Sequence, residues 1–197
     1  MGKKVFAILV LVLAGAAPSP ASQHHKLTPA DKAKRQALLA NPSNLQILPG
    51  VGAGQILLGE GQDQVLDYIG QPDYSWDQNF QGHRSTTWNY YDLNLQIVFD
   101  DNTAAPYVYS VSLVAWQKGN HTLGEIYWDK NVETPQVNWA TLDGIGLGTT
   151  SFDLIRKHPD PSLNNTLIIQ YSGDGMSYVT SVDHRITTIT VLRRGTL

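Results

Sequence analysis

Gly-Val-Gly-Ala-Gly-Gln-Ile-Leu-Leu-Gly at residues 50–59 leads into Asp-Gln-Val-Leu-Asp-Tyr-Ile-Gly-Gln-Pro at 63–72, and a similar phrase recurs downstream. The second copy reads Leu-Asp-Gly-Ile-Gly-Leu-Gly at 142–148 and Thr-Ser-Phe-Asp-Leu-Ile-Arg-Lys-His-Pro at 150–159. At a constant offset of 89 residues the copies align without gaps, and the matched pairs are Ile56 with Ile145, Leu58 with Leu147, Gly59 with Gly148, Val65 with Leu154, Leu66 with Ile155, and Pro72 with Pro161. We interpret this match as an internal repeat.

Each copy of the phrase describes the same local structure. Two apolar residues at spacing two precede a turn that glycine permits. A short helix follows the turn and buries its residues at i, i+1 and i+4. Gly70 ends the first helix and Pro159 ends the second. Segments typical of antiparallel strands follow each helix, at 93–99, 107–113, 167–171, 176–180 and 186–192. The sequence therefore predicts an α+β fold with two tandem repeats of a short helix plus an antiparallel β-meander.

The segment before the first repeat predicts one more helix. Thr28 is a capping residue, Pro29 suits the first helical position and Asp31 suits the first turn, so a short helix should run over residues 29–40. The resulting division of the chain is a signal peptide over 1–21, a polar N-terminal segment with this helix over 22–46, a first repeat over 47–133 and a second repeat over 134–197.

The N-terminus follows the plan of a secretory signal peptide. Lys3 and Lys4 form a basic start, residues 5–17 form an apolar run, and Ser19 and Ala21 suit a small-x-small cleavage site. The run is shorter than the about 20 apolar residues that a membrane span needs. We therefore expect cleavage after Ala21 and export to the periplasm or the extracellular space.

Composition narrows the partners of the exported chain. It contains no cysteine, so we expect neither a disulfide nor a lipid attached to a thiol. We therefore expect no stable membrane anchor. Removing Lys3 and Lys4 from the 14 Lys and Arg residues leaves 12 against 17 acidic residues, a formal net charge of about −5. No stripe of basic residues could replace the counterions of phosphates, so nucleic acid is not expected as a partner.

The repeated motif extends beyond the helix, as an apolar-x-Leu-Gly entry, a short helix, Gly-x-Pro, and a strand with Trp or Tyr that opens a meander. Its first copy is carried by Ile56, Leu58, Gly59, Val65, Ile69, Gly70, Pro72, Trp88 and Tyr90, and its second copy by Ile145, Leu147, Gly148, Leu154, Pro161 and Tyr171. This motif resembles the SmpA/OmlA outer-membrane assembly lipoproteins and the β-lactamase-inhibitor-protein repeat. The resemblance implies an extracytoplasmic helix-and-sheet repeat that binds a protein or an envelope component. The cysteines of both families are missing, so membrane anchoring is not carried over.

Motifs for catalysis are absent from the sequence. There is no Gly-Lys-Ser/Thr phosphate loop, no Gly-x-Ser-x-Gly elbow and no cysteine nucleophile, and we expect no cofactor. His158 at a helix end and His184 in a hairpin turn have ordinary structural placements. An acid-base pair such as His184 with Asp183 or Asp174 stays open. The alternative function is therefore a small extracytoplasmic hydrolase with a His/Asp pair on its loops.

One metal site depends on where the signal peptide is cleaved. Cleavage after Ala21 leaves Ser22, Gln23 and His24 at the new N-terminus. A free amine, two amides and a third-position imidazole form a square-planar set that suits Cu(II) or Ni(II). A flexible tail explains the same residues equally well. His24 is thus a candidate metal ligand only for that cleavage site.

Aromatic residues concentrate in the first half and in the segment that joins the halves. Adjacent rings, as in Tyr90 and Tyr91, point to opposite faces of a strand, so some must be exposed. Exposed Tyr and Trp on a sheet are frequent recognition anchors, although the same rings could seal a sheet edge or a second small core. We therefore expect a non-catalytic binding module that recognises a protein or cell-envelope component through an aromatic-bearing sheet face. The candidate binding residues are Trp76, Trp88, Tyr90, Tyr91, Tyr109, Trp116, Tyr127 and Trp128.

Overall fold

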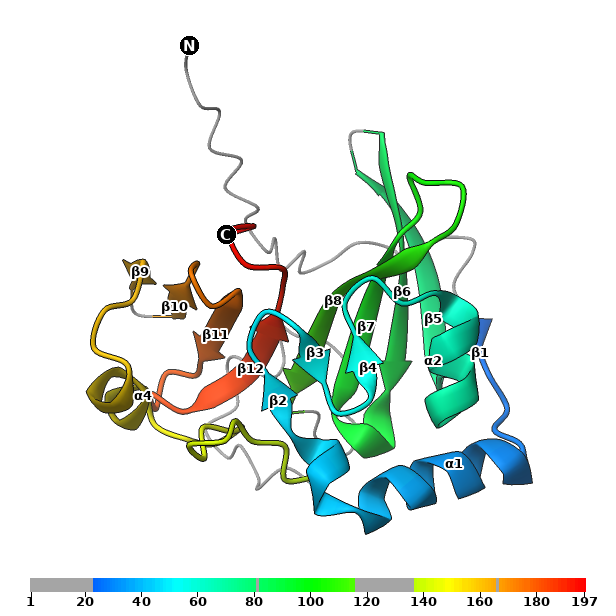
Figure 1. Ribbon diagram of the computed structural model, residues 1–197, viewed down its shortest axis with the longest axis horizontal. Coiled ribbons are helices and arrows are strands. Elements are labelled where there is room, and N and C mark those ends of the chain that lie inside the picture. The colour runs from blue at the N-terminus through cyan, green and yellow to red at the C-terminus, as the bar shows by residue number, and fades with distance from the viewer. Residues whose placement is uncertain (1–22, 81, 116–136, 166) are drawn as a thin grey trace.

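The computed structural model describes residues 23–80, 82–115, 137–165 and 167–197. Within these residues the chain forms a large antiparallel sheet, a small sheet and three α-helices (Figure 1). The α+β class with an antiparallel sheet, predicted from the alternating segments, is therefore confirmed.

The large sheet has nine strands, and neighbouring strands are antiparallel throughout. In spatial order they are β1 (Gln23–His24), β5 (Tyr74–Phe80), β6 (His83–Tyr90), β7 (Leu95–Asp100), β8 (Tyr107–Val114), β12 (Ile186–Val191), β11 (Met176–Thr180), β10 (Ile168–Tyr171) and β9 (Leu163–Asn164). Two meanders therefore meet at the centre, where β8 pairs with β12 and Leu113 lies opposite Ile189. Outward from this central pair, each strand lies earlier in its own meander than the one before it: β8, β7, β6, β5 on one side and β12, β11, β10, β9 on the other.

The helices and the small sheet complete the fold. The helices are α1 (Pro29–Ala40), α2 (Gln62–Ile69) and α4 (Ser151–Lys157), with short 3-10 turns η1 (Pro42–Leu45) and η2 (Tyr91–Leu93). The small sheet contains β2 (Ile47–Leu48), β3 (Gly52–Ala53) and β4 (Ile56–Leu57). In Figure 1, α2 and the small sheet lie over one face of the large sheet, and α1 runs along the edge of the molecule.

Local sequence explains where each helix begins. Thr28 accepts a hydrogen bond from Asp31 N while the Asp31 carboxylate accepts from Thr28 N, which is a complete capping box at the start of α1. Thr150 caps α4 in the same way through Asp153 N. In contrast, α2 is flanked by glycine caps, Gly61 before it and Gly70 after it, and the φ of 76° at Gly70 is a conformation that glycine adopts without strain.

The core lies between the large sheet and the elements that cover it. Alternate residues of the strands point into it, as period-two pleating requires, and Val65, Ile69 and Leu154 meet them from the helices. Hydroxyl and amide side chains occupy the other face. There Ser112 Oγ and Thr190 Oγ1 are 2.9 Å apart across the central strand pair. Both faces are well buried at the centre of the sheet.

The entry to α2 and the entry to α4 are bonded to the sheet in the same way. Gly59 and Gly148 both have positive φ, 97° and 82°, and their N–H groups donate to Val108 O at 2.9 Å and to Ile186 O at 2.8 Å. The reverse bonds run from Val108 N to Glu60 O at 2.7 Å and from Ile186 N to Thr149 O at 2.8 Å. Each glycine therefore docks its helix onto the last strand of the adjacent meander.

The turns inside the two meanders also correspond. Asn94 and Gly175 have φ of 54° and 66°, and their carbonyls accept from Val114 N and Leu192 N, both at 2.8 Å. Just before these turns, Tyr91 N donates to Asp73 Oδ2 at 2.8 Å and Ser172 N donates to Ser162 Oγ at 2.9 Å. An offset of 81 residues thus relates the two turns and the strands on either side of them.

An ion cluster fixes α1 to the first half. Arg35 is 2% exposed, and its guanidinium contacts Asp73 at 3.0 Å, Asp92 at 2.6 Å and the carbonyl of Gln71 at 2.5 Å. It also lies over the ring of Tyr90, 5.0 Å from the centroid. Burial raises the pKa of Asp92, and the charge of Arg35 opposes this. The Arg35 guanidinium thus joins two carboxylates and the Gln71 carbonyl, and we assign the cluster a structural role.

Candidate functional site

A cavity of about 290 Å³ lies where α4, β2 and the β10–β11 hairpin meet, and we name it the α4 cavity. Four segments contribute to its wall, and the lining residues are Ile47, Leu48, Pro49, Thr141, Leu142, Asp143, His158, Tyr171, Asp174, Met176 and Tyr178. An apolar cavity with a few polar groups at its rim is the usual form of a ligand site. It is therefore the strongest candidate site among the described residues.

The floor of the α4 cavity is apolar and aromatic. Ile47, Met176 and Tyr178 are buried core residues. The rings of Tyr171 and Tyr178 meet edge to face with centroids 6.0 Å apart. Burial raises the pKa of the Tyr178 phenol, so this side chain stays neutral at physiological pH. A ligand on this floor meets uncharged surface.

The rim of the cavity carries a hydrogen-bonded chain. His158 Nε2 lies 2.9 Å from Asp143 Oδ2, and Thr141 Oγ1 donates to Asp143 Oδ1 at 2.5 Å. The phenol of Tyr171 donates to His158 O at 2.6 Å. Partial burial raises the pKa of Asp143, but hydrogen bonds from Thr141 and His158 outweigh it and lower the pKa overall. Asp143 is therefore an ionised carboxylate with both oxygens already bonded.

Local structure brings the two rim residues together. His158 is the C-cap of α4, with its N–H on Leu154 O at 2.8 Å. Asp143 lies in a turn that Thr141 closes, because Thr141 Oγ1 accepts from Ile145 N at 2.9 Å, and Gly144 supplies a φ of 82°. The side chains of His158 and Asp143 are 39% and 41% exposed. The pair is therefore partly open to water.

The rim is poorly equipped for nucleophilic catalysis. A serine mechanism needs a hydroxyl that donates to the imidazole. Within the ranges that the structure describes, no hydroxyl is bonded to the His158 ring. Thr141 Oγ1 donates to Asp143 instead, and Ser162 Oγ is 2.7 Å from Ser172 Oγ. The His158–Asp143 pair therefore forms a polar edge beside an apolar cavity.

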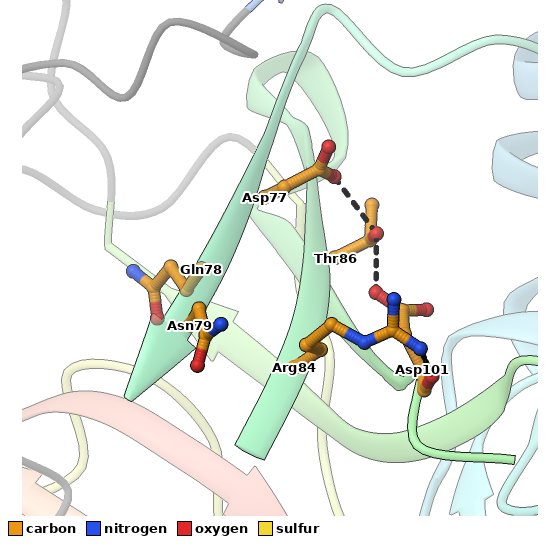
Figure 2. A pocket seen from close by; sticks show the side chains of 6 residues that line it. All are labelled: Asp77, Gln78, Asn79, Arg84, Thr86 and Asp101. Carbon is orange, nitrogen blue, oxygen red and sulfur yellow. Dashed lines mark hydrogen bonds between the residues drawn. The ribbon is translucent and has the colours of Figure 1, made fainter. Parts of the chain in front are cut away.

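A second cavity of about 290 Å³ lies at the tip of the β5–β6 hairpin and is polar throughout. Figure 2 shows Thr86 between two carboxylates, with its Oγ1 at 2.9 Å from Asp77 Oδ1 and 2.7 Å from Asp101 Oδ2. Arg84 Nη2 donates to the carbonyl of Asp101 at 3.3 Å. In the described part of the chain, no group of three or more potential ligands could hold a metal ion. This cavity lacks the apolar wall that would hold a ligand.

The five predicted binding aromatics that the structure describes do not form one surface. Trp88 and Tyr90 are in the core, and Tyr90 donates to Gly70 O at 3.0 Å. These two rings are therefore not available to a partner. Tyr91 and Tyr109 are half-buried. Three of the eight residues lie outside the described residues, namely Trp116, Tyr127 and Trp128.

A half-buried row of rings does stand on the outer strands. Tyr74 and Trp76 are alternate residues of β5, with ring centroids 5.5 Å apart, and His24 of β1 lies 4.7 Å from Tyr74. His24 was the candidate copper or nickel ligand for an N-terminus at Ser22, which lies outside the described residues. That metal site stays a prediction.

Comparison of the chain with protein-family models, with curated proteins and with solved structures finds no match. The resemblance to the SmpA/OmlA and inhibitor repeats therefore stays a prediction from the motif. None of the helices in the described ranges is long and apolar enough to cross a membrane.

The sequence did not point to the residues that build the α4 cavity. His184, the histidine suggested for an acid-base pair, instead lies against the ring of Phe152 at 5.5 Å. His158, interpreted as a helix end, is both the C-cap and the partner of Asp143. The available signal was that Asp143 and His158 both lie within the second copy of the repeated phrase, at 142–159.

Proposed function

We propose that this chain is an exported, non-catalytic binding module that recognises a protein or another cell-envelope component, and that its recognition site is the α4 cavity. The observation that carries the proposal is an apolar floor beneath a rim whose polar groups are already bonded to one another. The rim groups of Thr141, Asp143, His158 and Tyr171 are bonded within the rim, and an apolar group of a ligand that covered the floor would remove apolar surface from water. Holding a ligand is therefore the function that fits.

We further infer that the module consists of two tandem helix-plus-meander repeats. The matched bonds of Gly59 and Gly148 to the last strands support this reading, as do the matched turns at Asn94 and Gly175. The antiparallel pairing of β8 with β12 gives the sheet the same strand order outward from its centre. The pairing of β8 with β12 joins the two halves side by side. The α4 cavity is lined by both halves, since Ile47, Leu48 and Pro49 come from the first and the other lining residues from the second.

Exposed apolar groups near the cavity support a macromolecular partner. Leu142, which lines the cavity, is 89% exposed. Phe152 of α4 is 70% exposed, and Leu163 and Leu167 are exposed on the outer strands of the second meander. An apolar anchor ringed by polar groups is typical of protein interfaces.

A second function rests on the His158–Asp143 pair. A carboxylate that orients an imidazole is a component of many hydrolase sites. A small hydrolase that uses this pair to activate water would need a substrate bound in the α4 cavity. The partial exposure of the pair to water, and the lack of a bonded hydroxyl among the described residues, make this the weaker of the two proposals.

Photo-cross-linking tests the proposed recognition site. The photoreactive residue p-benzoylphenylalanine would replace Leu142 at the cavity, Trp76 on the sheet face or Leu39 on α1, and each chain would be irradiated in its native envelope or medium fraction. We expect a discrete cross-linked product from position 142, and no comparable product from position 39. A product from position 76 alone would move recognition to the aromatic row, and equal products from all three positions would contradict a specific site.

A further inference from the structure

The α4 cavity has a filled counterpart in the first half of the chain. The offset of 81 residues that matches the turns at Asn94 and Gly175 also pairs Tyr90 with Tyr171, Leu95 with Met176 and Ile97 with Tyr178. The three first-half residues have no exposed surface and belong to the main core. The matching second-half residues Tyr171, Met176 and Tyr178 belong to the same core, at 8%, 1% and 3% exposure, but they line a cavity. The two halves thus differ in what covers the same part of the sheet.

Trp139 joins the core of the first half beside Leu93. Its side chain is 1% exposed, and the indole Nε1–H donates to Leu93 O at 2.8 Å. The indole also approaches Gly54, since its Cζ3 lies 3.3 Å from the place that a Cβ on that glycine would take. Trp139 belongs to the segment that precedes α4, so the second half contributes a ring to the first. Leu93, which receives the bond, corresponds to Asp174 in the second half.

No ring returns from the first half to the second. The residue that approaches Asp174 from the segment preceding α2 is Gly50, where a Cβ would stand 3.0 Å from Asp174 O. Gly50 has no side chain to insert, and its φ of 69° disfavours any other residue. None of the described residues donates a hydrogen bond to Asp174 O. Arg194 Cγ lies 2.6 Å from the place that a Cβ on Gly50 would take, and neither residue belongs to the lining of the cavity.

We infer that the α4 cavity takes a flat aromatic ring that carries an N–H donor, and that the natural occupant is a tryptophan indole on the partner. This inference rests on the proposed binding function. The indole would lie on Met176 and the paired rings of Tyr171 and Tyr178, which suit aromatic contact through sulfur and ring edges. Its N–H would meet the carbonyl of Asp174, as that of Trp139 meets Leu93 O.

The two methionines of the chain make a direct test available. Met1 lies in the predicted signal peptide and Met176 lies on the cavity floor, so methyl-labelled methionine reports on the cavity through one assignable signal. The full chain would be titrated with three probes: N-acetyl-tryptophanamide, the isostere in which sulfur replaces the indole N–H, and N-acetyl-leucinamide. A Met176→Leu variant assigns the methyl signal, because leucine has nearly the same volume.

The expected result is a saturable shift of the Met176 methyl signal by N-acetyl-tryptophanamide. Loss of one hydrogen bond should weaken the sulfur isostere roughly 3- to 10-fold, and N-acetyl-leucinamide should bind more weakly than the indole probe. Equal affinity of the indole and its isostere, or stronger binding of the leucine probe, would overturn the indole inference and leave the binding cavity standing. No shift with any probe would overturn the indole inference and the proposed recognition site together.

Discussion

His158 and Asp143 are hydrogen-bonded across the rim of the α4 cavity, with 2.9 Å between Nε2 and Oδ2, and both side chains remain open to water. Such a pair can orient an approaching ligand or deprotonate a water molecule. The two proposed functions differ in which of these it does, so substitutions at the pair separate them.

Asp143→Asn keeps the size of the side chain and an acceptor for His158 but removes the charge. A binding module should keep its affinity for a captured partner within about threefold, because the floor supplies most of the contact. A hydrolase should lose activity by about 100-fold or more, since the carboxylate no longer stabilises the imidazolium. Partner affinity and turnover of ester, amide and glycoside substrates are the measurements. The free energy of unfolding should change by less than about 1 kcal/mol, as exposed ion pairs contribute little.

Arg35→Leu should destabilise the protein strongly. The substitution leaves the carboxylates of Asp73 and Asp92 without the guanidinium that joins them, at a cost of about 3–5 kcal/mol. Lys32→Ala, on the exposed side of the same helix, should change stability by less than about 0.5 kcal/mol. Urea unfolding of the two variants provides the comparison. A loss below 1 kcal/mol for Arg35→Leu would mean that the cluster does not hold α1 in place.

Acidification should loosen α1 through Asp31. The hydrogen bond from Thr28 lowers the pKa of this carboxyl, with further bonds from Gln71 N and Thr28 N outweighing its burial. Because the folded pKa is below the unfolded value of about 3.9, the stabilisation is present above that value and is lost as pH falls through the folded pKa.

Asp31→Asn should reduce the free energy of unfolding by about 0.5–2 kcal/mol at pH 7, and the variant should lose less stability than the parent between pH 5 and pH 2. Amide hydrogen exchange within α1 at several pH values measures both effects. Parallel pH profiles for the parent and the variant would show that Asp31 does not contribute to acid lability.

Two glycines in the second half should respond differently to alanine. Gly148 has a φ of 82° with open space around it, so Gly148→Ala carries only a conformational cost of about 1–2 kcal/mol. Gly173 also has open space but no positive φ, and Gly173→Ala should be neutral or stabilising by up to about 1 kcal/mol. Thermal unfolding of both variants is the measurement. Equal effects would mean that the bond from Gly148 to β12 does not require the glycine conformation.

Patterns with a short range were readable from the sequence, and contacts between distant segments were not. The alternation of Leu93, Leu95, Ile97 and Phe99 predicts a strand with one buried face, because pleating has a period of two. The alternate rings at Trp88 and Tyr90 could be placed on a strand, but not in the core. Arg35 of α1 lies over the buried Tyr90 ring, and this contact joins distant parts of the chain.

The candidate site was hidden for the same reason. Asp143 and His158 are 15 residues apart and meet only because a turn at Gly144 and the end of α4 face each other. Gly50 approaches Asp174 without a side chain, yet in the sequence this residue is one glycine of a turn among several. Neither feature has a local motif.

The most direct test of the account is the affinity of the captured partner for two matched variants. Leu142→Glu places a further carboxylate at the cavity, beside those of Asp143 and Asp174, on a side chain that is 89% exposed, and Leu39→Glu places one on α1, on a side chain that is 38% exposed. We predict that Leu142→Glu weakens partner binding by about tenfold or more while Leu39→Glu leaves it unchanged. Unchanged binding by a folded Leu142→Glu variant would contradict recognition through the α4 cavity.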